Sequence, residues 1–321
     1  MALPSSLKIE PLNEHLGVQL SNFVFEEAAN TEEFIDLMKK LLDKHLVVLM
    51  PQQKIRPQTI ERFTAQWGPL VNIKRAGNKA HHVPEAPWIK VISNGVAPDG
   101  IPYGDGNNSA QIWHSDSTPW EAPVGHISFY CRQTSNPAPK TFFKDMIKVY
   151  AALPQATKER INHLRSIHHF YPRQIEVKIH AEGPSMPLED RKLGVVHPLV
   201  RRHVSNGKPY LYLPTRRDSL IVGLTEEASK ALLTELWDFA NACKFDVGAA
   251  LMPDDFIIWD NSATVHEREG WPDDQVHLMW HTSSEGEVPI PFYPRRTVNT
   301  IGLSADDARA SHQKAMEMSD Y

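Results

Sequence analysis

Residues 112–131, IWHSDSTPWEAPVGHISFYC, join a polar H-x-D motif to a strand-like segment. In an extended chain, residues two apart point the same way, so His114 and Asp116 can hold one ion together. Ile127, Phe129 and Cys131 alternate with other residues and predict a strand over 125–134 with one apolar face. A chance H-x-D is the alternative in a chain with 16 histidines. The rest of the chain must therefore supply another ligand if a metal binds here.

Strands and helices are expected on both sides of this stretch. Apolar spacing, Thr31 as a cap and two glutamates in the first turn predict a helix over 31–46. The other expected helices cover 56–70, 144–152, 155–163 and 225–242, with a helix or tail over 304–321. The other expected strands cover 47–50, 88–93, 209–214, 254–261 and 275–283, and a Gly/Pro/Asn-rich loop covers 94–110. This pattern favours a mainly β fold with flanking helices.

Composition excludes several classes of protein. The 321-residue chain has a net charge of −5, which argues against a basic surface for nucleic acid. Its two cysteines are far apart, which argues against a disulfide framework or a thiolate zinc site. No apolar run is long enough to span a membrane, and no signal peptide is evident at the start. We expect a cytoplasmic protein that binds a small molecule and neither nucleic acid nor membrane, and homo-oligomer formation is compatible with the sequence.

A second histidine follows a strand and a turn in DDFIIWDNSATVHERE, residues 254–269, where it is His266. Two histidines and one carboxylate that bind one face of a metal leave three positions open, as in non-haem Fe(II) oxygenases. A zinc hydrolase with the same ligands is disfavoured because no general base stands out near them. A non-catalytic iron-binding sensor that keeps these three residues is a further alternative.

Several longer motifs resemble the taurine dioxygenase and 2,4-dichlorophenoxyacetate dioxygenase family of Fe(II)/2-oxoglutarate oxygenases. The matching segments are IWHSDSTPWEAPVGHISFYC, TFFKDMIKVYAALP, HPLVRRHVSNGKPYLYL, SLIVGLTEEASKALLTELWDFA and DFIIWDNSATVHERE, with LLDKHLVVLMPQQKIRPQTIERFTAQWGPL near the N-terminus. The resemblance implies a double-stranded β-helix, the jelly-roll or cupin-like core. It implies one oxygenase domain over 1–321, with an N-terminal α/β segment over 1–87, a core over roughly 88–290 and a tail over 300–321.

The resemblance also assigns roles to individual residues. It makes His114, Asp116 and His266 the ligands of Fe(II), and it places Thr141 against 2-oxoglutarate, which is consumed with O₂. The expected substrate-binding residues are Asn94, Tyr103, Trp120 and His281. The reaction would hydroxylate, desaturate or cleave a small anionic or aromatic metabolite. Because Asp116 is present, halogenation, which needs that position free for chloride, is disfavoured.

The chain departs from the family where an arginine should hold the distal carboxylate of 2-oxoglutarate. That arginine follows the second histidine by eleven residues, and His277 stands there instead; His281 replaces a second arginine found in some members. Three explanations stay open. An imidazolium at His277 could bind the co-substrate, Arg217 could replace the arginine, or the iron oxygenase could work without 2-oxoglutarate. For Arg268 we expect a structural salt bridge beside the metal-binding strand.

Overall fold

The computed structural model describes residues 3–71, 82–97, 100, 102–104, 106, 108–169 and 188–293. Contacts divide the chain into two compact units. The first contains Met1–Gln111, Val124–Lys144 and Asp246–Gly286, and the second contains Ile112–Pro123, Asp145–Phe245 and Glu287–Tyr321.

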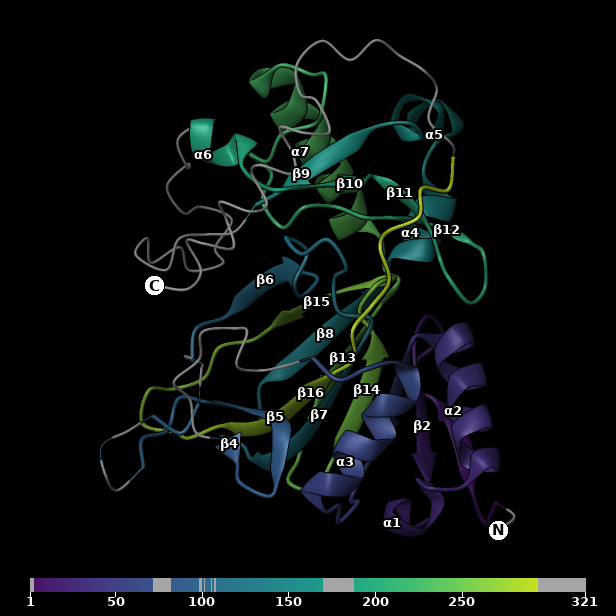
Figure 1. The fold of residues 1–321 in the computed structure, drawn as a ribbon, viewed down its shortest axis with the longest axis vertical. Coiled ribbons are helices and arrows are strands. Elements are labelled where there is room, and N and C mark those ends of the chain that lie inside the picture. The colour runs from purple at the N-terminus through teal and green to yellow at the C-terminus, as the bar shows by residue number, and fades with distance from the viewer. Residues whose placement is uncertain are drawn as a thin grey trace. The chain divides into compact units, whose positions relative to one another are not determined.

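An eight-stranded sheet dominates the first unit (Figure 1). Its strand order is β1-β2-β3-β14-β7-β16-β5-β4. The strands are β1 Lys8–Pro11, β2 Val18–Ser21, β3 Val47–Met50, β14 Phe256–Asp260, β7 His126–Gln133, β16 Leu278–Ser283, β5 Ala86–Ser93 and β4 His82–Val83. All five residues of β14 are buried, as expected for a central strand covered on both faces. The sheet thus joins strands that lie more than 200 residues apart in the sequence.

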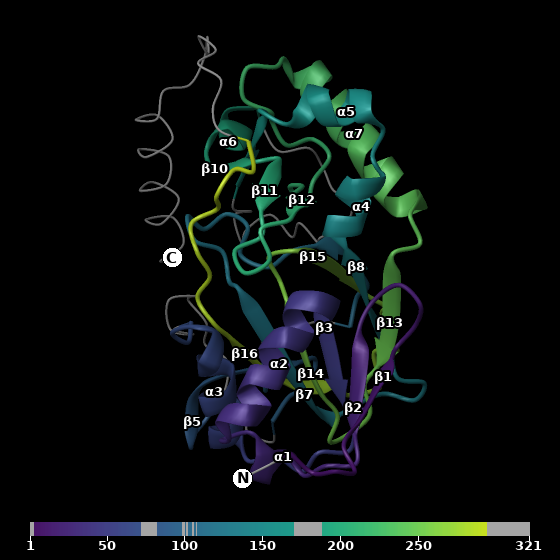
Figure 2. The same cartoon turned by 90° about the vertical axis from the view of Figure 1, so that its right-hand side faces the viewer.

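Helices from the N-terminal segment cover one face of this sheet (Figure 2). They are α1 Phe25–Ala28, α2 Glu32–His45 and α3 Pro57–Thr64, which the 3-10 turn η1 Ala65–Trp67 extends. The Thr31 side chain caps α2, and Leu46 ends it in a left-handed conformation. The buried faces of these helices join an apolar cluster with the sheet that includes Phe25, Phe34, Phe63, Tyr130 and Phe256. These elements confirm the N-terminal helices and strand expected from the sequence, although α3 ends earlier.

A second sheet of four strands has the order β13-β8-β15-β6. Its strands are β13 Asp246–Ala250, β8 Lys140–Asp145, β15 Thr264–Arg268 and β6 Gln111–His114. Its Phe143 ring lies 5.1 Å from the Trp259 ring of β14, so side chains of the two sheets meet in one core. A tight turn connects β14 to β15, and Asp260 Oδ1 accepts hydrogen bonds from the amides of Ser262 and Ala263 at 2.8 and 3.2 Å. This turn carries the chain directly from the buried strand to His266.

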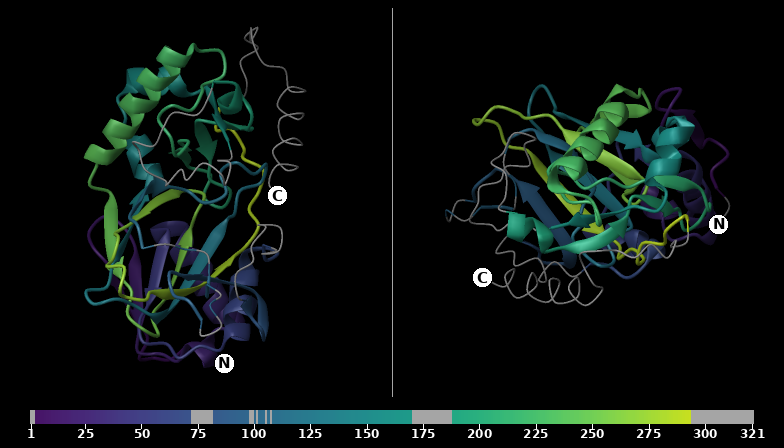
Figure 3. Two further views of the ribbon diagram at one scale, coloured as in Figure 1. Left: turned by 90° about the vertical axis from the view of Figure 1, so that its left-hand side faces the viewer. Right: turned by 90° about the horizontal axis from the view of Figure 1, so that it is seen from above.

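The second unit combines helices with two short antiparallel sheets of two strands each. The helices are α4 Met146–Ala152, α5 Gln155–Ile161, α6 Leu188–Lys192 and α7 Glu226–Ala242, the long green helix of Figure 3. The strands are β9 Arg165–His168 with β10 Val195–Pro198, and β11 Val200–Arg202 with β12 Pro209–Leu211. Thr225 caps α7, whose Trp237 indole donates to the Pro214 carbonyl at 3.0 Å. That contact fixes the loop after β12 against the helix.

The mainly β architecture with flanking helices is confirmed. Within the part of the chain that the structure describes, no helix combines the length and apolarity that a membrane span requires. The helix or tail expected over 304–321 lies outside the described residues.

Candidate metal centre

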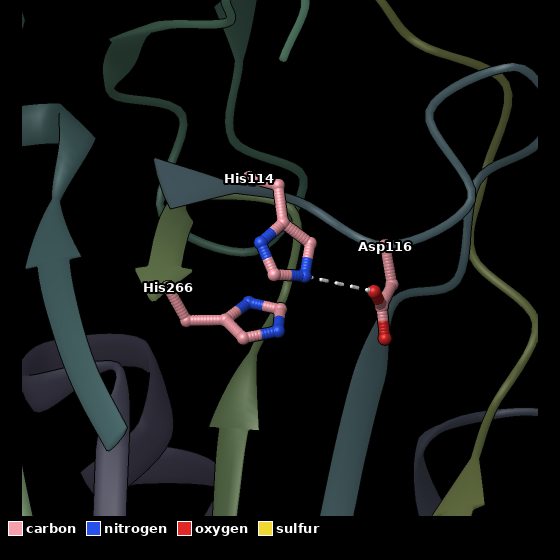
Figure 4. Close-up of side chains that lie close together, drawn as sticks. All are labelled: His114, Asp116 and His266. Atoms are coloured by element: carbon pink, nitrogen blue, oxygen red, sulfur yellow. Dashed lines mark ion pairs between the residues drawn. The ribbon is translucent and has the colours of Figure 1, made fainter. Parts of the chain in front are cut away.

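Three side chains converge to form a group with the chemistry of a metal site (Figure 4). His114, Asp116 and His266 each offer one ligand atom, and these atoms all lie within 4.8 Å of one another. Both histidines are buried, and the Asp116 side chain is 36% exposed. The three residues predicted from the sequence as iron ligands are therefore close enough to bind one ion.

The sheet explains how two histidines 152 positions apart in the sequence meet. His114 ends β6 and His266 lies within β15, and these strands are neighbours in the four-stranded sheet. Two aromatic rings border the His266 imidazole: Phe143 stacks on it at 6.3 Å with an angle of 27°, and Trp259 meets it edge-on at 5.3 Å. Both rings come from strands in the core. They limit the rotation of the imidazole and so keep it aimed at the other two side chains.

Hydrogen bonding sets the tautomer of His114. Its Nδ1–H donates to the Ile112 carbonyl at 2.6 Å, which leaves the lone pair of a neutral imidazole on Nε2. Nε2 lies 3.5 Å from Asp116 Oδ1. Two acceptor atoms at this distance repel each other unless a cation or a proton lies between them. A carbonyl that orients a metal-binding histidine in this way is the usual outer partner of such a ligand. The donor set of two imidazoles and one carboxylate fits Fe(II).

A pocket of about 160 Å³ opens beside His114 and Asp116. Its other lining residues are Ser115, Ser117, Thr118, Pro119, His168, His169, Pro214, Thr215 and Ser219. Most of these side chains are small or uncharged, and no lysine or arginine is among the lining residues that the structure describes. The pocket therefore offers space and hydroxyl groups next to the metal-binding residues.

Two of the lining residues are buried histidines, His168 and His169. Burial lowers the pKa of His168 well below its usual value and lowers that of His169 to about 4, so both rings are neutral at pH 7. The His197 ring lies 5.0 Å from that of His168, and its Nε2 donates to the carbonyls of Thr118 and Trp120 at 2.9 and 3.1 Å. His168 and His169 were not expected from the sequence to be site residues. The signal they offered was a histidine pair at the end of β9 and directly after it.

Thr141 lies on β8, the strand next to that of His266, and is 8% exposed. His277 precedes β16, is 6% exposed, and shares a hydrogen bond between its Nδ1 and Thr134 Oγ1 at 3.1 Å. Burial, and secondly the charge of Arg268, lower the pKa of His277 to about 4. This favours a neutral imidazole at neutral pH, in place of the imidazolium considered from the sequence.

Arg268, two residues after His266, is half-buried. Its Nη2 donates to the Ser109 carbonyl at 2.8 Å, and its guanidinium lies 4.5 Å from the centre of the Trp271 ring. Burial lowers the pKa of Arg268 to about 10, so it stays protonated at neutral pH. The structure thus places a positive charge on the strand that carries His266.

The predicted substrate-binding residues occupy different places. The Asn94 amide donates to the Gln275 carbonyl at 2.8 Å and accepts from the His277 amide at 3.0 Å. Tyr103 packs against the apolar cluster beneath the N-terminal helices. The His281 ring on β16 lies 5.3 Å from the Phe129 ring. Trp120 directly follows the lining segment 114–119. None of the four lines the described pocket itself.

Arg217, which was expected near the co-substrate, and its neighbour Arg216 both form ion pairs. Arg217 binds Asp238 of α7 at 2.6 Å, and its side chain is 32% exposed. Arg216 is buried and binds Asp218 through two parallel hydrogen bonds of 2.7 Å. Neither residue lines the described pocket. Their charges are thus matched within the second unit.

Comparisons with known proteins agree with this architecture. A family model described as "Taurine catabolism dioxygenase TauD, TfdA family" matches residues 8–282. A (S)-phenoxypropionate/alpha-ketoglutarate-dioxygenase of Sphingobium herbicidovorans is 27% identical over 292 residues, which cover 87% of this chain and 95% of that protein. Pentalenolactone F synthase of Streptomyces arenae is 25% identical over 248 residues, which cover 74% of this chain and 82% of that protein.

Solved structures share the fold. A taurine dioxygenase from Burkholderia xenovorans superposes with a TM-score of 0.69 at 23% identity, covering 89% of this chain and 93% of the other. AAD-2 in complex with Mn(II) and N-oxalylglycine superposes with a TM-score of 0.70 at 21% identity, covering 88% and 98%. These likenesses confirm the jelly-roll core. The family match over most of the chain shows that it belongs to the taurine catabolism dioxygenase TauD, TfdA family.

Proposed function

We propose that this chain is an Fe(II)- and 2-oxoglutarate-dependent dioxygenase that oxidises a small anionic or aromatic metabolite with O₂. The observation that carries the proposal is the convergence of His114, Asp116 and His266 within 4.8 Å. The family match and the relatives named as alpha-ketoglutarate-dependent dioxygenases support the same reaction class. Hydroxylation, desaturation and cleavage of the substrate are the outcomes open to this chemistry.

The iron, when bound, supplies the redox chemistry that activates O₂, and the chain supplies the surroundings in which that chemistry is directed. The Ile112 carbonyl keeps the proton of His114 on Nδ1, so Nε2 is available as a ligand. Phe143 and Trp259 hold the His266 ring and exclude water from its buried side. Because the chain would supply only three ligands, further positions on a bound iron would remain available to co-substrate and O₂.

We place the substrate in the pocket beside His114 and Asp116. The neutral rings of His168 and His169 can donate or accept hydrogen bonds without adding charge, and Pro119 and Pro214 offer apolar surface. This lining suits a ring or a short carbon chain with a polar group. Relatives named for phenoxypropionate and 2,4-dichlorophenoxyacetate favour a carboxylate attached to an aromatic ring.

Further proposals concern the domain organisation, location and partners of this protein. We propose one oxygenase domain that works in the cytoplasm on a small molecule, without nucleic acid or membrane. Light scattering of the purified protein would decide between a monomer and a homo-oligomer.

Anaerobic spectroscopy tests the proposed function. Fe(II) added with 2-oxoglutarate should give the weak visible charge-transfer band of a chelated keto acid, and the band should be absent from His266→Ala. O₂ should then be consumed with formation of succinate. Absence of both the band and succinate from the wild-type protein would contradict the proposal.

An iron oxygenase independent of 2-oxoglutarate is the second candidate, favoured by one observation. Position 277 carries a buried neutral imidazole where the family has a cation for the co-substrate. In that case O₂ uptake depends on substrate and Fe(II) alone, and 2-oxoglutarate neither binds nor changes the rate.

A further inference from the structure

We propose that Arg268 supplies the positive charge for the distal carboxylate of 2-oxoglutarate, so that the cation comes from β15 instead of from position 277. This inference rests on the proposed use of 2-oxoglutarate. It assigns to Arg268 a binding role in place of the structural salt bridge expected from the sequence.

The register of β8 and β15 places Arg268 opposite Thr141. The Glu269 amide donates to the Lys140 carbonyl at 2.9 Å, and in an antiparallel ladder such a bond joins residues directly opposite each other. The stacked rings of Phe143 and His266 fit the same register three residues further along. Between these pairs, Arg268 faces Thr141. Side chains that are opposite each other in this way have Cβ atoms roughly 5 Å apart.

Arg268 also shares a face of the strand with a metal-binding residue. Residues two apart in a strand point to the same side, so Arg268 and His266 lie on one face, with Cα atoms about 7 Å apart. A dicarboxylate with a short carbon chain can bind the metal at one end and reach the next side chain on this face with the other. The planar guanidinium can hold a carboxylate through two hydrogen bonds, and the Thr141 hydroxyl can add a third.

Two contacts hold the guanidinium beside position 277. It donates to the Ser109 carbonyl and lies over the Trp271 ring, while the His277 ring meets the same indole at 4.8 Å. The positive charge of Arg268 therefore lies near His277, which stands where the family has an arginine. Arg268 belongs to β15, whereas His277 directly precedes β16.

The identity of residue 277 fits this arrangement. An arginine at 277 would place a second cation next to Arg268, and two like charges in a half-buried site repel each other. A neutral histidine avoids that repulsion and fills the space beside Trp271. The histidine at 277 and the arginine at 268 are thus explained together as one exchange of positions.

The test compares two keto acids on the intact protein. Binding of 2-oxoglutarate and of 2-oxopentanoate, which has the same keto-acid end but no distal carboxylate, is measured by anaerobic titration calorimetry with Mn(II) in the site. We expect the wild type to prefer 2-oxoglutarate by roughly 30-fold or more, the typical effect of one buried charge pair. Arg268→Met should lose this preference and bind 2-oxopentanoate as the wild type does. Arg268→Lys should keep part of it.

Arg132→Met is the matched control, because Arg132 also lies over an indole, that of Trp280 at 4.6 Å, and is exposed on β7. It should keep the full preference. The double variant Arg268→Met/His277→Arg returns a cation to this region from position 277, directly before β16, and we expect it to recover preference for 2-oxoglutarate. A purely structural role of Arg268 would not produce this rescue.

The outcomes separate the two proposals. An unchanged preference in Arg268→Met, or its loss in Arg217→Met instead, overturns the assignment of Arg268 while leaving the use of 2-oxoglutarate intact. Failure of the wild type to bind 2-oxoglutarate overturns both. If Arg268→Met does not fold, as judged by circular dichroism, Arg268→Gln and Arg268→Gln/His277→Arg supply the same comparison.

Discussion

Replacing Asp116 by asparagine should remove most of the stabilisation that a divalent metal gives to this protein. The change keeps the shape of the side chain and removes only its charge. In the metal-free protein we expect little change in stability, because the Asp116 side chain is 36% exposed. An asparagine side chain can also keep a hydrogen bond with His114 Nε2, which lies 3.5 Å from Asp116 Oδ1, whether that nitrogen donates or accepts. The variant should therefore be about as stable as the wild type without metal.

The size of the effect with metal follows from the exposure of the carboxylate. Asp116 is 36% exposed, so we take the lower end of the cost of losing one partner of a close charge pair, about 2 kcal/mol or roughly 30-fold in affinity. Metal at 100 times the wild-type Kd stabilises the wild type by about 2.7 kcal/mol. The same concentration stabilises the variant by only about 0.9 kcal/mol.

Thermal unfolding with and without Mn(II) measures this difference. For a chain of this length we expect Tm to rise by about 4 °C in the wild type and by about 1 °C in Asp116→Asn. Asp36→Asn, on the exposed face of α2, removes an equal charge far along the sequence and should respond as the wild type does. A full Mn(II) shift in Asp116→Asn would refute its role as a ligand. A metal-free variant several degrees less stable would show that the Asp116 charge itself stabilises the metal-free protein.

Three further predictions concern pH, capping and packing. Burial lowers the pKa of His277 to about 4, whereas the value in the unfolded chain is about 6.5, so unfolding takes up a proton between these pH values. The free energy of unfolding should therefore fall, as the pH falls through this window, by up to about 1.4 kcal/mol per pH unit. Urea midpoints of His277→Gln should depend less steeply on pH there, and an unchanged pH dependence would contradict this prediction. Asp145 caps α4 by accepting two amide hydrogen bonds of 2.9 and 3.0 Å. In urea titrations, Asp145→Ala should therefore lower the free energy of unfolding by about 1–2 kcal/mol, and Asp145→Ser should lower it by less because serine can also cap a helix. Phe143 is fully buried against His266, so Phe143→Ala should lower the free energy of unfolding by about 3–5 kcal/mol, and Phe143→Leu, which loses less volume, should lower it by less. Both variants should bind Mn(II) more weakly than the wild type by calorimetry. Equal Mn(II) affinity in all three proteins would show that the Phe143 ring does not orient His266.

Local patterns were sufficient for much of the fold. The helix over 31–46 carries its own cap at Thr31 and a continuous apolar stripe, and the structure begins and ends α2 within one residue of the expected bounds. The helix expected over 56–70 ends at Thr64 and continues as a 3-10 turn, because Gly68 has φ 141° and the chain leaves the helix there. Helix ends depend on contacts beyond the local pattern, so the presence of each of these helices was predicted more accurately than the residues at which it begins and ends.

The sequence by itself determined the candidates for the metal ligands and the family. A histidine and an aspartate two residues apart in an extended chain point to the same side, whatever the rest of the fold. The sequence motifs around them identify the family, whose model matches residues 8–282. Only the tertiary structure decided which charges lie near them. It paired Arg217 with Asp238, buried His277 as a neutral ring, and brought His168 and His169 to the pocket. Strand register set Arg268 opposite Thr141, although the two are 127 residues apart. Burial and cross-strand register arise from contacts between distant segments, so no local pattern could reveal them.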